Sequence, residues 1–133
     1  MTVLADTSAW VEFLRATGSA SNMALRDLLV AGDLATTDAV VLEVLAGAND
    51  ARQSRDLVRL LGRCSWLPQE PWADAELAAS MYSACRQRGQ TPRSLLDCLI
   101  AAVAVRCDVA VLHRDRDFDL LASRTSLRVS PTT

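Results

Sequence analysis

The feature of the sequence that most constrains the fold is an alternation of short, β-branched and aliphatic runs with longer segments of helical periodicity. The short runs predict strands at 2–5, 34–36, 65–67, 109–112 and 127–129. The periodic segments predict helices at about 9–16, 21–31, 39–47, 50–63, 73–88, 95–106 and 118–122. Strands that are separated by helices pair in parallel, and the helices cover the sheet. The sequence therefore predicts an α/β fold built on a helix-covered parallel sheet.

The sequence predicts a single domain over residues 1–133, because no repeat, low-complexity tract or linker divides it. Half of its residues are hydrophobic, which excludes intrinsic disorder. Its apolar stretches are shorter than the ~20 residues that span a bilayer. Asp6 interrupts the N-terminal segment too early for a secretory signal. We therefore expect a cytoplasmic protein that makes no contact with membranes.

Acidic side chains stand at the positions where open α/β sheets bind their ligands, directly after strands. Asp6 follows the first predicted strand, and Asp115 and Asp117 follow the fourth. Asp97 opens the apolar helix that precedes the fourth strand. Glu43 is the single charge in another helix that is otherwise apolar. Residues far apart in the sequence are thus predicted to place several carboxylates at one edge of the sheet.

Each of these acids has an ordinary structural explanation when it is taken alone. Asp6 and Asp97 stand where carboxylates cap helices or stabilise the first turn. Glu43 fits the solvent-facing stripe of an amphipathic helix, and Asp115 and Asp117 fit a solvated loop. Gathered together, however, the acids repel one another strongly unless a hard divalent cation neutralises them. The combination therefore predicts Mg²⁺ as the cofactor, with Mn²⁺ as the alternative ion.

The sequence excludes several other acid-rich or phosphate-binding classes. All 14 cationic side chains are arginine, so the lysine that a receiver domain needs is missing. Residues 6–8 read Asp-Thr-Ser, which is not the Asp-x-Asp of a haloacid-dehalogenase phosphatase. No glycine-rich phosphate or dinucleotide loop is present. Arginines 86, 88, 93, 114 and 116 are candidates to hold phosphates, with solvated surface charge as the alternative.

The chain resembles the PIN-domain ribonucleases, and more narrowly the VapC toxins, in motifs that run from its first strand to its last. These motifs are Asp6-Thr7-Ser8, Glu43 in its apolar helix, Asp97 before Cys98-Leu-Ile-Ala-Ala-Val, and His113-Arg-Asp115-Arg-Asp117-Phe118. The resemblance implies a three-layer α/β/α sandwich with a central, mostly parallel sheet of about five strands. It also implies an acidic Mg²⁺ site that cleaves RNA to products with 5′-phosphate and 3′-hydroxyl ends.

The resemblance further implies which residues do the chemistry. Asp6, Glu43, Asp97 and Asp115 match the family's catalytic acids, and Asp6 and Asp97 match those that hold the metal. Asp115 and Asp117 share one Asp-x-Asp-Phe segment. We favour Asp115 as the fourth acid and keep Asp117 as the alternative.

The function that the resemblance implies is that of a Mg²⁺-dependent endoribonuclease toxin from a type II toxin–antitoxin system. Such a toxin is neutralised by a VapB antitoxin, and it forms homodimers and larger toxin–antitoxin assemblies. Two alternatives stay open at this point. One is a PIN-domain nuclease of RNA processing that has no antitoxin, and the other is a catalytically silent module that binds RNA or protein.

Overall fold

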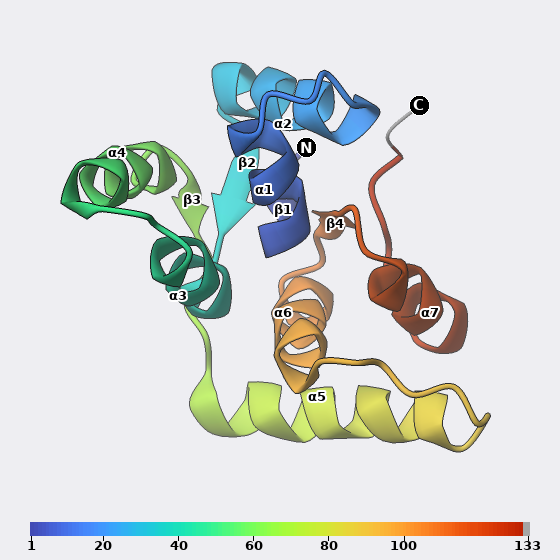
Figure 1. Ribbon diagram of the computed structural model, residues 1–133. Helices are drawn as coiled ribbons and strands as arrows, with labels where there is room; N and C mark the ends of the chain where they lie inside the picture. The colour runs from blue at the N-terminus through green and yellow to red at the C-terminus, as the bar shows by residue number, and fades with distance from the viewer. Residues whose placement is uncertain (132–133) are drawn as a thin grey trace.

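Four short strands form one parallel sheet at the centre of the computed structural model, which describes residues 1–131 (Figure 1). The strands are β1 (Val3–Ala5), β2 (Leu34–Thr36), β3 (Ser65–Trp66) and β4 (Ala110–Leu112). Their order is β3-β2-β1-β4, and every neighbouring pair is parallel. The predicted α/β fold with a central parallel sheet is confirmed.

The fifth predicted strand, at 127–129, pairs only through a single parallel bridge between Val111 and Val129. The Val111 amide donates to the Arg128 carbonyl at 3.0 Å, and the Ser130 amide donates to the Val111 carbonyl at 2.8 Å. Pro131 follows at once, and a proline has no N–H with which to extend the ladder. The segment therefore adds to the edge of the sheet without becoming a full strand.

The seven predicted helices are present in the described part of the chain, with ends that differ by a few residues. They are α1 (Thr7–Leu14), α2 (Ala20–Ala31), α3 (Asp38–Ala46), α4 (Ala51–Leu61), α5 (Pro71–Arg86), α6 (Leu95–Arg106) and α7 (Arg116–Arg124). In the view of Figure 1, α2 lies above the strands, α1 overlaps β1 and β2, and α5, α6 and α7 gather below and beside the sheet. None of the described helices is long and apolar enough to cross a bilayer.

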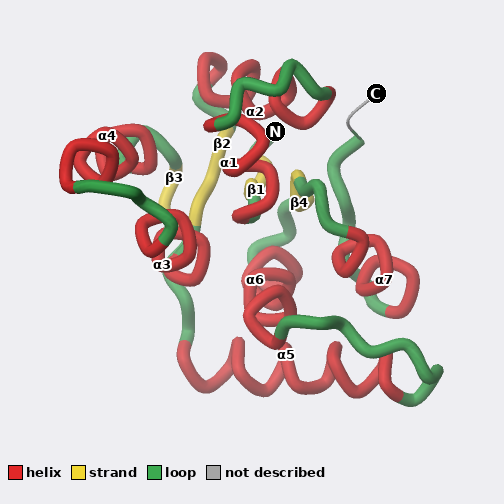
Figure 2. Tube along the Cα trace, viewed as in Figure 1, coloured by secondary structure: helices red, strands yellow, loops and turns green. Residues whose placement is uncertain are grey.

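Helix α6 is the central helix of the molecule, because its side chains from Cys98 to Ala104 are buried except for the partly buried Leu99. It packs against α5, α7, α3 and β4. Figure 2 shows the loop between α5 and α6 running back past α7 to the start of α6. A helix that is apolar on every face must lie inside the fold. The acid in its first turn, Asp97, is consequently placed in the interior as well.

A buried ion pair joins the end of α6 to the start of α5. Asp74 is fully buried, and its carboxylate accepts hydrogen bonds from Arg106 Nε at 2.7 Å and Nη2 at 3.0 Å. Arg106 Nη2 also donates to the Pro68 carbonyl at 2.8 Å. The guanidinium thus ties together α6, α5 and the loop that precedes α5.

Candidate active site

The candidate site lies where three helices begin beside the carboxyl ends of β1 and β4. Asp6 follows β1 directly and is the N-cap residue of α1. Asp115 follows β4 by three residues and caps α7. Asp97 lies in the first turn of α6, which Ser94 caps by accepting from the Leu96 and Asp97 amides. Local capping chemistry therefore fixes where each of these carboxylates stands.

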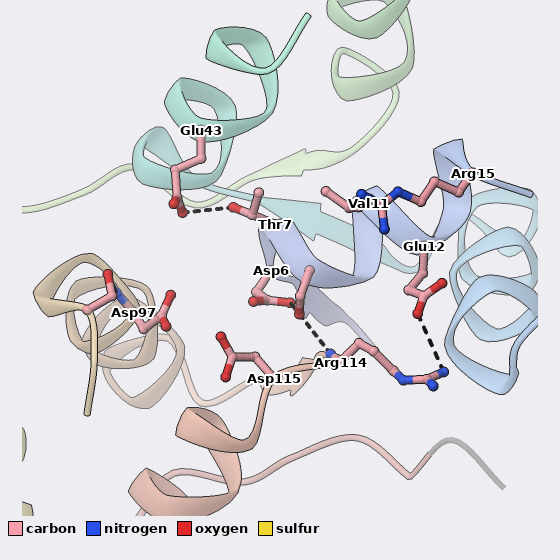
Figure 3. A pocket seen from close by; sticks show the side chains of 11 residues that line it. Asp6, Thr7, Val11, Glu12, Arg15, Glu43, Asp97, Arg114 and Asp115 are labelled. Atoms are coloured by element: carbon pink, nitrogen blue, oxygen red, sulfur yellow. Dashed lines mark hydrogen bonds and ion pairs between the residues drawn. The ribbon is translucent and has the colours of Figure 1, made fainter. Parts of the chain in front are cut away.

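One pocket of about 440 Å³ brings the four predicted acids together. Its lining includes Asp6, Glu43, Asp97 and Asp115 (Figure 3). These side chains come from the N-caps of α1 and α7 and from within α3 and α6, and they project toward a common space. Asp117, the alternative fourth acid, lines a neighbouring pocket instead.

Hydrogen bonds from residues in the first turn of α1 hold the Asp6 carboxylate in place. Its Oδ1 atom accepts from Ser8 Oγ at 2.7 Å and from the Ala9 amide at 3.2 Å. Ser8 Oγ in turn accepts from the Arg114 amide at 2.7 Å, which links α1 to the loop after β4. Burial raises the pKa of Asp6 to about 6, although these hydrogen bonds act in the opposite direction. Since the hydrogen bonds from Ser8 Oγ and the Ala9 amide both go to Oδ1, Oδ2 is the oxygen best placed to bind an ion.

Glu43 is half-buried on α3 and is held by Thr7, because Thr7 Oγ1 donates to Glu43 Oε1 at 2.8 Å. The contact joins α1 to α3 at the rim of the pocket. Sequence reasoning used Thr7 only as part of a motif and did not find this role. A contact between residues 36 positions apart leaves no local signal in a single sequence.

Asp97 is the least compensated acid in the pocket. The residue is only 8% exposed, and its carboxylate accepts no hydrogen bond from the described residues. Burial, followed by the charges of Asp115, Asp6, Glu43 and Asp117, raises its pKa to about 7. Like charges at close range disfavour ionisation in this way. The Asp97 carboxylate is therefore suited to bind a cation, because no cationic side chain among the described residues pairs with it.

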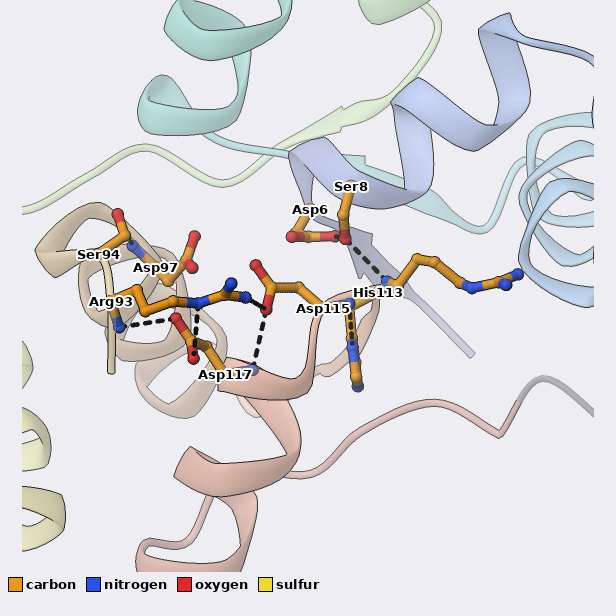
Figure 4. A network of polar contacts seen from close by, with 9 residues as sticks. Asp6, Ser8, Arg93, Ser94, Asp97, His113, Asp115 and Asp117 are labelled. Carbon is orange, nitrogen blue, oxygen red and sulfur yellow. Dashed lines mark hydrogen bonds and ion pairs between the residues drawn. The ribbon is translucent and has the colours of Figure 1, made fainter. Parts of the chain in front are cut away.

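Asp115 and Asp117 lie close to Asp97, and one oxygen of each of the three falls within 4.8 Å of the others. Asp115 Oδ1 accepts from Arg93 Nη2 at 3.1 Å and from the Asp117 amide at 3.0 Å (Figure 4). Asp117 is buried, and its Oδ2 accepts from the Arg93 amide at 2.8 Å. Asp117 thus anchors the loop before α6, whereas Asp115 faces the pocket.

His113 shapes the turn that carries Asp115. Its Nδ1 accepts from the Asp115 amide at 3.1 Å, and its Nε2 lies 3.2 Å from Asp119 Oδ1. The ring also packs on Phe118, with centroids 5.4 Å apart. An acceptor at Nδ1 requires that the proton of a neutral imidazole be on Nε2. His113 therefore supports Asp115 from behind and does not line the pocket of the four acids.

The donor set fits a hard divalent cation. It offers carboxylate oxygens, which Mg²⁺ and Mn²⁺ prefer, and it contains no thiol or imidazole that would favour a softer metal. Asp97 lacks a hydrogen-bond donor among the described residues, so an ion would satisfy a buried charge that is otherwise unpaired. The excess of acids over cations at Asp97, Asp6 and Glu43 points to the same kind of occupant.

We predict that the ion-free protein loses stability as the pH rises from about 5 to 8. The pKa values of Asp97 and Asp6 are raised to about 7 and about 6, so the folded state keeps protons that the unfolded state releases above 3.8. Their contribution to stability is present at low pH and is lost as the pH passes through these folded-state values. Thermal unfolding in excess chelator measures the effect.

Two controls make this measurement specific. Added Mg²⁺ should raise Tm more at pH 8 than at pH 5, because protons compete with the ion for the same carboxylates. The Asp97→Asn variant should lose most of the pH dependence, whereas Asp27→Asn, on the exposed face of α2, should keep it. An equal Tm for the ion-free wild type at both pH values would contradict the prediction.

The chain is similar to known proteins over nearly its whole length. The PIN domain family model matches residues 3–123. Ribonuclease VapC11 of Mycobacterium tuberculosis is 42% identical over 130 residues, which cover 96% of this chain and 97% of the relative. A VapC ribonuclease of Mycobacterium bovis has the same identity and coverage.

Solved structures share the fold at low sequence identity. A VapBC2 complex from Rickettsia felis, bound to a promoter DNA fragment, matches with a TM-score of 0.77 at 16% identity, over 98% of both chains. A FitAcB structure from Neisseria gonorrhoeae matches with a TM-score of 0.71 at 22% identity, again over 98% of both chains.

Proposed function

The chain belongs to the PIN domain family, and from this premise we propose that it is a metal-dependent endoribonuclease and the toxin of a type II toxin–antitoxin pair. Residues 1–133 form a single PIN domain in this proposal. Its relatives at 42% identity, over nearly the whole chain, are named as VapC ribonucleases. The substrate is RNA, and the reaction is hydrolysis of a phosphodiester bond.

The observation that carries the proposal is the convergence of Asp6, Glu43, Asp97 and Asp115 on one pocket without enough cations to balance them. A silent binding module has no need for this arrangement, which costs stability in the absence of an ion. In the proposal Asp6 and Asp97 hold Mg²⁺, with Mn²⁺ as the alternative. When bound, the ion stabilises charge on the phosphate and lowers the pKa of the attacking water.

The chain's own residues then orient the reactants. Asp6 is fixed by Ser8 and Ala9, so its free oxygen keeps one direction. Glu43, held by Thr7, faces the pocket from α3 and is placed to orient water through its second oxygen. Asp115 lies on the opposite side of the pocket from Glu43, and a hydrogen bond from Arg93 holds its carboxylate in place. The roles of Glu43 and Asp115 are to hold water and to accept its proton.

The proposal includes a VapB-type antitoxin as the partner that neutralises the activity, and a homodimer that enters larger toxin–antitoxin assemblies. VapBC complexes are among the solved structures whose fold this chain shares. Co-expression separates the toxin from a PIN-domain nuclease of RNA processing. Growth should stop when the chain is expressed alone and resume when the neighbouring antitoxin gene is expressed with it.

Cleavage of RNA by the purified protein tests the proposed reaction. We expect products in Mg²⁺ or Mn²⁺, none in excess chelator, and recovery when the metal is restored. Attack of water on phosphorus that breaks the bond to the 3′-oxygen leaves 5′-phosphate and 3′-hydroxyl ends. Attack by the RNA 2′-hydroxyl, which expels the 5′-oxygen, leaves a 2′,3′-cyclic phosphate and a 5′-hydroxyl. Sequencing of the product ends with and without phosphatase treatment distinguishes the two. Undiminished cleavage in chelator, or cyclic phosphate ends, would overturn the mechanism.

A further inference from the structure

Two pairs of arginines flank the acidic pocket. Arg15 and Arg114 line the pocket itself, and Figure 3 shows them on the side opposite Asp97. Arg93 and Arg116 line a second pocket of about 300 Å³, which also contains Asp117. Figure 4 shows Arg93 beside Asp97, on the other side of Asp115. We call Arg15 and Arg114 the α1-side pair, and Arg93 and Arg116 the α7-side pair.

The two pairs have cationic charge to offer a ligand. Arg15 and Arg116 are exposed, and neither side chain makes an ion pair or hydrogen bond with another described residue. The Arg114 side chain is 56% exposed and lies 3.6 Å from Glu12, and the Arg93 side chain is 65% exposed. Arg93 is also paired with the two carboxylates that follow β4, at 3.1 and 3.7 Å, and one of these is buried. It can therefore offer a phosphate only the guanidinium donors that these two pairs leave free.

The arginines lie on both sides of the acidic pocket, where they can bind the phosphates of an RNA strand that crosses it. The acids between the two pairs repel RNA, even when an ion neutralises part of their charge. Guanidinium groups on both sides offset this repulsion, and their planar forks match phosphate oxygens. The pocket of the α7-side pair is also large enough for a small ligand group. The protein as a whole carries a net charge of −2, so this concentration of cations is local.

We propose that single-stranded RNA crosses the acidic pocket from one arginine pair to the other, and that each pair binds a backbone phosphate beside the scissile one. The inference rests on the proposed function and specifies where the RNA strand runs across the protein. The acids act on the phosphate in the middle, and the arginines hold its neighbours on either side. The α7-side pair and the α1-side pair therefore contact opposite ends of the RNA.

The first test measures binding without cleavage. The probe is a fluorescent 12-nucleotide RNA of mixed sequence, and its anisotropy is followed in Ca²⁺ over a range of salt concentrations, with gels to verify that it stays intact. The variants Arg15→Gln and Arg116→Gln remove one charge each without releasing a paired carboxylate. Arg55→Gln, on exposed α4, is the matched control.

We expect each of the two flanking variants to weaken binding several-fold. The slope of log K against log salt should fall by about 0.7, which is the value for one phosphate contact to a single strand. Arg55→Gln should leave both quantities unchanged. If Arg15→Gln and Arg116→Gln bind the probe with the wild-type slope, the proposed path is wrong.

The second test asks which side each arginine contacts. It uses an RNA that the protein cleaves, shortened one nucleotide at a time from either end. Arg116→Gln should raise KM with little change in kcat, and this effect should vanish when nucleotides are removed from one side of the cut. The effect of Arg15→Gln should vanish only on removal from the opposite side. If shortening the RNA from the same end removes the effects of both variants, or if shortening from either end removes neither effect, the proposed path is wrong.

The two tests separate this inference from the proposed function. If the wild type cleaves RNA but the arginine variants bind and cleave normally, the path is wrong and the nuclease assignment stands. If no RNA is cleaved but both variants still lose a salt-sensitive contact, the phosphate sites stand and the nuclease assignment falls.

Discussion

Replacing Asp97 with asparagine is expected to abolish RNA cleavage while leaving the fold intact. The substitution keeps the shape of the side chain but removes the charge that faces Asp6 across the pocket. The loss should reach about three orders of magnitude or more, because an ion contributes several kcal/mol of charge stabilisation and each ~1.4 kcal/mol is a factor of ten. Single-turnover cleavage of a labelled RNA at saturating protein measures it.

The same variant should be more stable than the wild type when no ion is present. Asp97 is a buried charge with no hydrogen-bond donor among the described residues, and removing it relieves repulsion from Asp115, Asp6 and Glu43. A rise in the free energy of unfolding at pH 8 in chelator, together with lost activity, separates a functional acid from a structural one. Asp27→Asn should change neither. Full activity in Asp97→Asn, free of contaminating nuclease, would remove Asp97 from the mechanism.

Replacing Arg106 with methionine is expected to lower the free energy of unfolding by about 3–5 kcal/mol, because it leaves the charge of Asp74 buried without its partner. Burial alone would raise the pKa of Asp74, but hydrogen bonds from Arg106 hold it below its usual value of 3.8. This contribution to stability is therefore present above pH 3.8 and is lost as the pH falls through the lowered value. Urea unfolding at pH 7 measures the change.

Two further variants show whether the loss comes from the unpaired charge. The double variant Asp74→Leu with Arg106→Met should recover most of the stability, since apolar residues can replace a buried ion pair with little cost. Arg59→Met breaks an exposed pair with Asp56, and it should cost less than about 1 kcal/mol. If the double variant is as unstable as Arg106→Met, packing rather than charge explains the effect.

The order and type of the elements could be predicted from the sequence because local patterns carry them. The start of α7 shows where this reasoning weakens. The prediction began that helix at 118, whereas it begins at Arg116 because Asp115 caps it by accepting from the Asp117 amide. Charged residues at the start of the helix hid its periodicity. The segment at 127–129 reads locally as a strand, yet only Val129 forms a bridge.

The acids of the site could be predicted from the sequence, but the contacts that hold them in place could not. Asp6, Asp97 and Asp115 follow strands or begin helices, so topology alone brings them to one edge. The Ser8 hydroxyl meets the Arg114 amide across 106 positions, and Arg93 meets Asp115 across 22. Such pairings depend on the completed fold. The structure also gives Asp115 and Asp117 different surroundings, since Asp115 lines the acidic pocket and Asp117 accepts a hydrogen bond from the Arg93 amide.

The central claim is that the clustered carboxylates form a divalent-ion site. Calorimetric titration of Mn²⁺ into the chelator-treated protein at pH 8 tests it most directly, with Asp97→Asn and Asp27→Asn titrated in parallel. The account predicts saturable binding to the wild type and to Asp27→Asn, and at least a roughly tenfold weaker affinity in Asp97→Asn, where one ligand charge is missing. Equal affinity in all three proteins, or no binding to the wild type, would contradict it.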